Sequence, residues 1–393
     1  MDSLYFSIHS LMPIVWVSLA IALLAIMWLL TAYRGRLAKI RRTSQPRSGE
    51  MPEPEPESWP GVSVIVHAQD SSRQLAAMLP AVLQQDYPGD FEVVVVNDGS
   101  SRDVTDVVNF LSNTYHNLHI TFVPFEAHNL SRTKLGISLG IKAARYPYVI
   151  ITTSLADIPS NAWLRLMAEP FARGKEVSLG TSRLTGIKGA MNRFDELEAQ
   201  TIWLSAAMAG HPYRGTGYNI GYRRSLFFDA KGFSRSLTLH HGEDDIFISQ
   251  IATPDNTAAV VDPAATIAVN RYMPVKALRD LRMQHTFTGR FISKGASRLF
   301  GFSTIMLWVW LAATTTGVVM SLPNLLPSCV FLAAAIGLWT PLIAVWRHAA
   351  RAQEMPLNAW ALPWLLFWRW CRTLRYRLNC GRASRKNYTW IQR

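Results

Sequence analysis

The stretch Phe91-Glu92-Val93-Val94-Val95-Val96-Asn97-Asp98-Gly99-Ser100 decides the fold class of this chain. Four consecutive valines are typical of a strand that is buried on both faces, as in a parallel sheet. The polar residues after them form a tight turn, and Ser100 with Asp103 makes a capping-box pattern that opens a helix. The stretch therefore predicts a strand, a turn and a helix. A tight turn alone explains Asp98 equally well, since such turns are common between elements.

Strands and helices alternate on both sides of this stretch. Further strands are predicted over 62–66, 120–123 and 148–152, and helices over 73–83 and 133–144. This alternation predicts an open, largely parallel sheet in an α/β domain. Ligands of such sheets bind beyond the carboxyl ends of the strands. Asp70, Asp98 and Asp157 each follow a strand and are the first candidates for a site.

Three apolar stretches predict contact with a membrane. Residues 11–30 carry no charge and are long enough for one span, because roughly 20 apolar residues cross a bilayer. Residues 299–346 are long enough for two spans, separated by a turn at 321–324. Residues 357–368 are too few for a span and predict a short re-entrant or interfacial helix.

Basic residues flank the predicted spans and set their orientation. They are Arg34, Arg36, Lys39, Arg41 and Arg42 after the first span, and Arg347 and Arg351 after the last. Because basic flanks remain on the cytoplasmic side, region 33–298 is expected in the cytoplasm. Anionic lipids explain the formal charge of +13 better than nucleic acid does, since many basic residues lie in these flanks and the tail. The chain's three cysteines begin at Cys329, so region 33–298 has no disulfide framework or thiol-ligated metal.

The chain divides into six predicted segments. These are a transmembrane anchor (1–33), a basic and Pro/Glu-rich linker (34–60), the α/β domain (61–270), amphipathic interfacial helices (271–298), two transmembrane helices (299–346) and a basic cytoplasmic tail with the short apolar helix (347–393). The linker composition cannot bury a core. The amphipathic segment alternates basic and apolar residues, which suits the inner leaflet beside a site.

Several ordered motifs resemble family 2 glycosyltransferases with the GT-A fold. They are the strand at 62–66, the stretch 91–100 and the helix at 134–141. Gly217-Tyr218-Asn219-Ile220-Gly221-Tyr222-Arg223, Lys231-Gly232-Phe233 and Gly242-Glu243-Asp244-Asp245-Ile246-Phe247 resemble membrane-bound members from Bacteroidetes-type bacteria. The resemblance covers most of the chain. It implies an enzyme of the bacterial inner membrane that transfers a sugar from a nucleotide-diphosphate sugar to a lipid or glycan acceptor.

The resemblance also assigns donor-binding residues. Asp98 with Gly99 would contact the nucleoside, Asp70 would lie near the base, and Lys134 would approach the diphosphate or the nucleoside. An ammonium suits a diphosphate as a point charge. An exposed helical lysine without a ligand is the alternative. Asn219 would line the acceptor side.

The metal-binding motif of the resembled family is altered in this chain. Ser154 and Ala156 stand where the family has two aspartates, and Asp157 is the carboxylate that remains nearby. One or two carboxylates are often enough to hold Mg²⁺ together with phosphate oxygens. A divalent cation, Mg²⁺ or Mn²⁺, at Asp157 is thus one expectation. The other is a turn aspartate before Pro159.

An acidic triplet, Glu243-Asp244-Asp245, matches the family motif that supplies the catalytic base. By that match Asp244 would take the proton of the acceptor hydroxyl. The alternative is that these carboxylates only stabilise the start of a helix. Further along, Gln284 and His285 would meet the diphosphate or the acceptor, unless the histidine is simply packed.

Two rival functions remain from other classes of protein. A catalytically impaired relative acting as a membrane scaffold or partner subunit would explain Ser154 and Ala156. A transporter would carry polar or charged residues inside several spans, and the predicted spans have few. The sequence therefore favours a glycosyltransferase, which the resemblance implies to be inverting, with the scaffold as the alternative.

Overall fold

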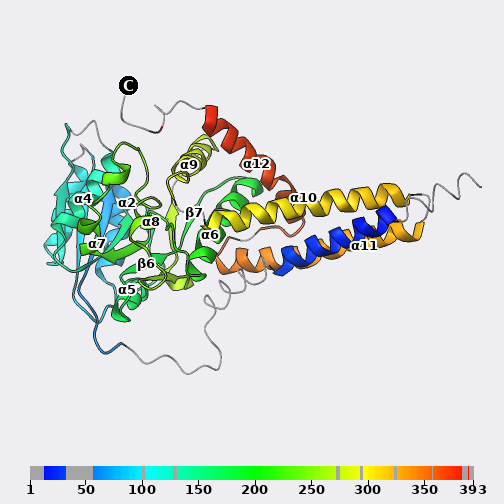
Figure 1. Ribbon diagram of the computed structural model, residues 1–393. Helices are drawn as coiled ribbons and strands as arrows, with labels where there is room; N and C mark the ends of the chain where they lie inside the picture. The colour runs from blue at the N-terminus through cyan, green and yellow to red at the C-terminus, as the bar shows by residue number, and fades with distance from the viewer. Residues whose placement is uncertain are drawn as a thin grey trace, which may run out of the picture.

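The computed structural model describes residues 13–31, 56–99, 102–126, 131–270, 275–292, 295–322, 325–355, 357–382 and 388. An α/β domain forms one end of the molecule, and an arm of long helices projects from it (Figure 1). The capping pattern predicted at Ser100 and most of the linker 34–60 lie outside the described residues.

The main sheet has seven strands in the order β3-β2-β1-β4-β8-β6-β9. Their bounds are β1 (Val62–Ala68), β2 (Phe91–Asn97), β3 (Leu118–Phe122), β4 (Tyr148–Thr153), β6 (Val177–Gly180), β8 (Ile220–Arg223) and β9 (Thr257–Val260). β1 pairs in parallel with both β2 and β4, as predicted. β8 runs antiparallel to its two neighbours, so the sheet is rich in parallel strands but mixed.

Helices cover both faces of this sheet. They are α2 (Ser72–Leu83), α3 (Asp103–Ser112), α4 (Arg132–Ala143), α5 (Trp163–Ala172), α6 (Ala190–Met208), α7 (Arg224–Asp229) and the short α8 (Ile248–Ile251). Alternate residues of β1 enter different clusters: Val64 packs with α2 and α5, and Ile65 packs with α4. Because both faces are buried, the strands read as continuous apolar runs.

A second, small sheet has the order β5-β10-β7. Its strands are β5 (Ala156–Asp157), β10 (Ile267–Asn270) and β7 (Ser182–Thr185), and two 3₁₀ turns, η1 (Ser234–Ser236) and η2 (Pro263–Ala265), lie in the connecting segments. β5 follows β4 after two residues. The small sheet therefore lies at the carboxyl end of the central strands, where ligands are expected.

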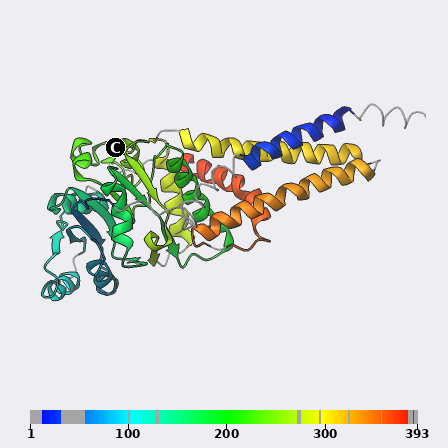
Figure 2. The same ribbon diagram turned by 90° about the horizontal axis from the view of Figure 1, so that it is seen from below.

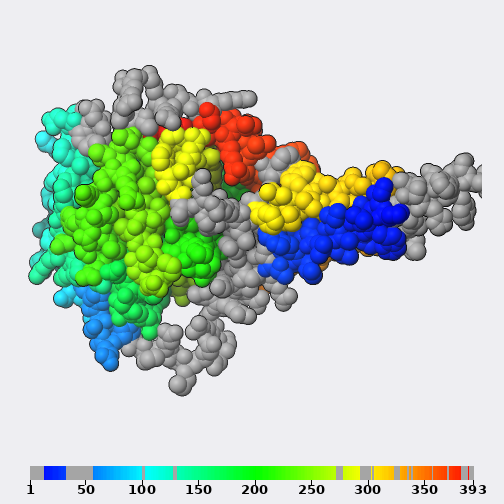
Figure 3. All heavy atoms as spheres, in the orientation of Figure 1, coloured from blue at the N-terminus to red at the C-terminus, as the bar shows by residue number. Residues whose placement is uncertain are grey.

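The arm consists of the N-terminal helix Pro13–Thr31, α10 (Gly295–Ser321) and α11 (Leu325–Ala352), which project in the same direction in both ribbon views (Figures 1 and 2). The N-terminal helix and α10 lie against each other in the space-filling view (Figure 3), and the rings of Trp28 and Phe302 are 4.7 Å apart. Within the described residues, the N-terminal helix alone is long and apolar enough to cross a membrane; the apolar run Ile305–Ser321 is shorter.

Two further helices, α9 (Val275–Thr288) and α12 (Leu362–Arg382), lie beside the base of the arm (Figure 1). The prediction of a short helix over 357–368 is wrong in its length, because α12 runs from Leu362 to Arg382. Basic residues of α12 that read as a tail pair instead with carboxylates of α6: Arg369 with Glu198 and Arg372 with Asp195. Burial raises the pKa of Asp195 to about 6, against the opposing effect of Arg372.

Candidate active site

The ends of β1 and β2 bring the predicted donor residues together. The backbone N–H of Asp98 donates to the carbonyl of Ala68 at 2.8 Å, which joins the two strand ends. Asp70 has a φ of +42°, a conformation that aspartate tolerates better than most residues. A Cβ on Gly99 would lie 2.1 Å from Oδ1 of Asp70. Glycine at 99 is therefore what allows Asp70 to fold over this turn.

Asp98 is buried, with 3 % of its surface exposed. Its Oδ1 accepts a hydrogen bond from Nε of Arg132 at 2.7 Å, and its Oδ2 lies 3.0 Å from Nε2 of His67. Arg132 is the first residue of α4, so this ion pair ties the helix to the end of β2. Asp98 lies at the predicted donor edge, and its two oxygens already have protein partners.

Lys134, also on α4, acts as a clamp. Its ammonium donates to the carbonyls of Ser236, Leu239 and His241 at 2.6, 2.9 and 2.8 Å. These bonds use all three donors of the side chain. Burial lowers the pKa of Lys134 to about 8, although nearby carboxylates, chiefly that of Glu243, oppose the shift. Lys134, expected at the diphosphate, instead holds the loop that leads to the acidic triplet.

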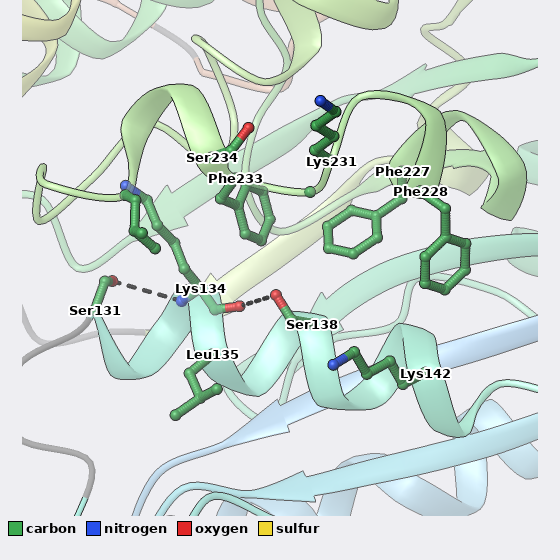
Figure 4. A pocket seen from close by; sticks show the side chains of 12 residues that line it. Ser131, Lys134, Leu135, Ser138, Lys142, Phe227, Phe228, Lys231, Phe233 and Ser234 are labelled. Carbon is green, nitrogen blue, oxygen red and sulfur yellow. Dashed lines mark hydrogen bonds between the residues drawn. The ribbon is translucent and has the colours of Figure 1, made fainter.

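An open cavity of about 350 Å³ lies beside the side chain of Lys134 (Figure 4). Its walls come from α4 and from the segment 227–237, with Phe228, Lys142 and Lys231 among the lining residues. In Figure 4 the Lys134 side chain rises from α4 toward the loop that carries Ser234. Lys134 is therefore one of the residues that line this cavity, whereas Glu243, Asp244 and Asp245 are not.

The three carboxylates of the acidic triplet have different surroundings. Asp245 is 1 % exposed; it accepts hydrogen bonds from the hydroxyl of Thr288 and, at 2.5 Å, from the N–H of Ile246. Glu243 lies 3.8 Å from Nδ1 of His241. Burial would raise the pKa of Glu243, but His241, the charge of Lys134 and a backbone hydrogen bond together outweigh burial and lower the pKa. Asp245 thus anchors α9, and Glu243 pairs with its neighbour.

Asp244 lies between a cation and an imidazole. Its Oδ2 is 3.8 Å from Nη2 of Arg214 and 3.8 Å from Nε2 of His285, and its side chain keeps 14 % exposure. The N–H of Gly215 donates to the Asp244 carbonyl at 2.9 Å, which fixes the backbone. Burial and the charge of Asp245 raise the pKa of Asp244 to about 7, while Arg214 opposes the rise. Such a carboxylate can accept a proton near neutral pH.

His285 and Arg214 are in direct contact. Nη2 of Arg214 lies 3.0 and 2.9 Å from the two ring nitrogens of His285. Burial, followed by the charges of Arg214 and Arg282, lowers the pKa of His285 well below its usual 6.5. His285 is therefore neutral at physiological pH and can accept a hydrogen bond from the guanidinium. The structure places His285, on α9, 3.8 Å from Asp244.

Asn219, expected on the acceptor side, is completely buried instead. Its amide donates to the carbonyls of Thr181 and Ala265 at 2.8 and 2.9 Å, and its oxygen accepts from the indole of Trp163 at 3.2 Å. It ties the segment before β8 to its neighbours. Gln284 is half-buried on α9, and its backbone carbonyl oxygen lies 3.2 Å from the hydroxyl of Thr288.

The residues near Asp157 do not form a good divalent-cation site. The hydroxyl of Ser154 lies 2.5 Å from that of Ser71, and Ala156 is buried. Neighbouring side chains of a strand point to opposite faces, so Asp157, which is exposed, projects away from the Ala156 side. Across the described part of the chain, no group of three or more His, Cys, Asp or Glu residues could hold a metal.

Sequence reasoning missed four side chains that the fold brings to these places. They are His67, Arg132, Arg214 and Thr288. Arg132 stands two positions before a predicted site lysine, and Arg214 precedes a glycine-rich loop. Neither position has a pattern that marks it as functional, because the partners are 34 and 30 residues away in sequence.

Comparison with known proteins gives the fold and the family. A mannosyltransferase, PcManGT from Pyrobaculum calidifontis, solved with GDP-Man and Mn²⁺, has a TM-score of 0.50 and 19% identity, covering 85% of this chain and 98% of its own. TarS 1–349 from S. aureus has a TM-score of 0.40 and 17% identity, covering 83% and 91%. Chondroitin synthase of Escherichia coli is 23% identical over 221 residues, 48% of this chain.

The match spans only 31% of the length of the chondroitin synthase, and the activity of that whole enzyme is therefore not assigned to this chain. The family model described as glycosyl transferase family 21 matches residues 15–377. The expected glycosyltransferase with a GT-A-like domain is therefore confirmed, with the matching family numbered 21 rather than 2. The likeness to Bacteroidetes-type members stays a prediction. By the extent of this match, the chain belongs to glycosyl transferase family 21.

Proposed function

We propose that the protein transfers a sugar from a nucleotide-diphosphate sugar to a lipid or glycan acceptor, with Asp244 as the general base. The observation that carries the proposal is the surroundings of Asp244. This carboxylate is partly exposed, lies 3.8 Å from both Arg214 and His285, and has a pKa raised to about 7 by burial and by Asp245. A base is most effective when its pKa lies near the working pH.

The reaction is a direct displacement at the anomeric carbon. Asp244 takes the proton of the acceptor hydroxyl while the acceptor oxygen forms the new bond to that carbon. The bond from the anomeric carbon to the diphosphate breaks on the opposite side, and its electron pair leaves with the nucleotide. The configuration at the carbon is inverted. No step is assigned to a divalent cation, because Ser154 and Ala156 supply no carboxylate.

The donor occupies the edge formed by Asp70, Asp98 and Gly99. Two observations support this placement: the edge lies at the carboxyl ends of β1 and β2, and α4 links the edge to the acidic loop through Arg132 and Lys134. PcManGT and a TarS structure were solved with GDP-Man and UDP-GlcNAc, respectively. These ligands support a nucleotide sugar as the donor here.

The acceptor reaches the site from the cytoplasmic face of a membrane. The N-terminal helix Pro13–Thr31 supports membrane association, and the basic residues after residues 31 and 346 favour a cytoplasmic α/β domain. His285 and Thr288 on α9 contact the acidic triplet. An acceptor carried in or on the membrane would therefore approach Asp244 along α9.

A donor screen tests the proposal. The full chain, purified with native lipids, is incubated with a panel of nucleotide sugars, and the released nucleoside diphosphate and the product are measured. We expect one donor to give a glycosylated product whose anomeric configuration is opposite to that of the donor. Retained configuration would contradict direct displacement. Nucleotide binding without any transfer would favour the impaired scaffold, for which Ser154 and Ala156 speak.

A further inference from the structure

The side chain of Arg214 contacts the base from a loop that sequence motifs did not single out. The loop joins α6 to β8 and is fixed at Gly215 and at Thr216, whose hydroxyl lies 2.7 Å from that of Ser182. The guanidinium is largely buried, at 17 % exposure. Among the residues that the structure describes, its Nε is enclosed without a hydrogen-bond partner. A charge held this way needs a reason beyond packing.

The charged and titratable groups around Asp244 come from its own loop, from α9, from α4 and from the loop between α6 and β8. Glu243 and Asp245 flank it on its own loop and disfavour its ionised form. His241 lies on the same loop and pairs with Glu243. From α9, His285 is neutral.

The remaining cation near Asp244 is Lys134 on α4, and its three donors are used by backbone carbonyls. In the described part of the molecule, Arg214 is thus the permanently charged group within ion-pair distance of the base. It faces Asp244 and the ring of His285 with the same nitrogen, Nη2.

We propose that Arg214 is a positioning residue that keeps Asp244 ionised and aimed at the acceptor, with the neutral ring of His285 holding the guanidinium in place. This inference rests on the proposed function of Asp244 as the base. A role for Arg214 at the departing diphosphate is the competing assignment. In a direct displacement the leaving group departs on the side opposite the attacking oxygen, so a cation in contact with the base lies on the acceptor side.

The size of the effect follows from the surroundings. An opposite charge within about 4–6 Å lowers the pKa of an aspartate by about 1–3 units. With a pKa of about 7, half of Asp244 is ionised at pH 7. Loss of Arg214 would then reduce the ionised fraction at pH 7 by between about 5- and 500-fold, because each unit changes it about tenfold.

The test is the pH profile of transfer for Arg214→Gln, Arg214→Lys and the wild type. We expect the acid limb to move up by about 1–3 pH units in R214Q, with the rate returning toward that of the wild type at high pH. In R214K the limb moves less, because the charge remains but the fork to His285 is lost. The matched control is Arg223→Gln, which removes an exposed arginine paired with Glu176 at 3.0 Å and leaves the limb unmoved.

A lower plateau with an unmoved acid limb in both Arg214 variants would overturn the proposal and assign Arg214 to the donor. An equal shift in R223Q would overturn it too. If R214Q does not fold, R214K decides between the same two outcomes. Measured affinity for the nucleoside diphosphate should be unchanged in R214K, whereas a diphosphate contact would lower it.

A second readout does not depend on activity. Carbodiimide labels protonated carboxyl groups, so its pH dependence at Asp244, measured by peptide mass spectrometry on the full chain, reports the protonation of that group. Labelling of Asp244 should persist to higher pH in R214Q and R214K than in the wild type. Identical midpoints would overturn the inference. If no donor supports transfer by the wild type, the proposed function fails, while this labelling still tests the role of Arg214.

Discussion

Replacement of Lys134 by methionine distinguishes a structural clamp from a donor contact. Methionine keeps most of the apolar stem, so the change removes mainly the ammonium and its three hydrogen bonds, of 2.6, 2.9 and 2.8 Å. The carbonyls of Ser236, Leu239 and His241 then lose their partner. Each unpaired buried acceptor costs about 1–3 kcal/mol, and water can reach part of the loop, so K134M should lower the unfolding free energy by about 2–5 kcal/mol.

The corresponding change in unfolding temperature is measurable. For a domain of 150–250 residues, a loss of about 1 kcal/mol lowers the unfolding temperature by about 2–4 °C, so K134M should unfold roughly 4–20 °C below the wild type. Lys142→Met is the matched control, because Lys142 lies two turns further along α4 and is exposed. It should unfold within about 1 °C of the wild type, since exposed substitutions rarely matter.

Amide hydrogen exchange locates the effect. K134M should speed exchange in the loop 234–245 and leave the β1–β2 edge protected, because the clamp holds only the loop. The reasoning is refuted if K134M unfolds with the wild type while its affinity for the nucleoside diphosphate falls more than about tenfold. Lys134 would then contact the donor, as the sequence resemblance implied.

Two further predictions concern the altered metal motif and α12. Ser154→Asp combined with Ala156→Asp should increase the affinity for Mn²⁺ by at least about tenfold, because the double variant supplies the two carboxylates that such a site uses. Unchanged Mn²⁺ binding, measured by calorimetry, would show that the metal motif does not lie at positions 154 and 156. In the folded chain the pKa of Asp195 is raised to about 6, so the protonated carboxyl group stabilises the fold. This stabilisation is fully present when the pH is below the pKa of Asp195 in the unfolded chain, and it is lost as the pH rises through 6. Asp195→Asn should flatten the fall in unfolding temperature between about pH 4 and 6, and an unchanged slope would show that Asp195 does not titrate there.

The positions of the first four strands along the chain could be predicted because their signals are local. A short run of four β-branched valines between Glu92 and Asn97 is typical of a buried strand, and glycine and proline separate the elements. The antiparallel strand β8 was not predicted, since its four residues are too few for a periodic pattern. The length of α12 was missed for another reason: Arg372 is a tail residue by composition and becomes part of a packed helix only beside Asp195.

The candidate site was predictable in its motifs but not in its contacts. Asp98 and Asp244 were found from their flanking residues, and the fold pairs Asp98 with Arg132 and brings Asp244 to 3.8 Å from Arg214. The roles of Lys134 and Asn219 depend on carbonyls up to 107 residues away, which no local pattern reveals. Arg214 is positioned by the same long-range packing. Sequence motifs therefore indicated the class of reaction. Which side chains are free to contact a ligand depends on tertiary contacts, which the motifs do not reveal.

The rate of sugar transfer by Asp244→Asn, measured with saturating donor beside the wild type, tests the central claim most directly. Asparagine has nearly the same shape, and the hydrogen bond from the N–H of Gly215 goes to the backbone carbonyl of residue 244, so this contact is kept. If Asp244 is the base, the rate constant should fall by about 10²–10⁴-fold, while the affinity for the nucleoside diphosphate stays within about threefold. Equal rates for the two proteins would contradict the account.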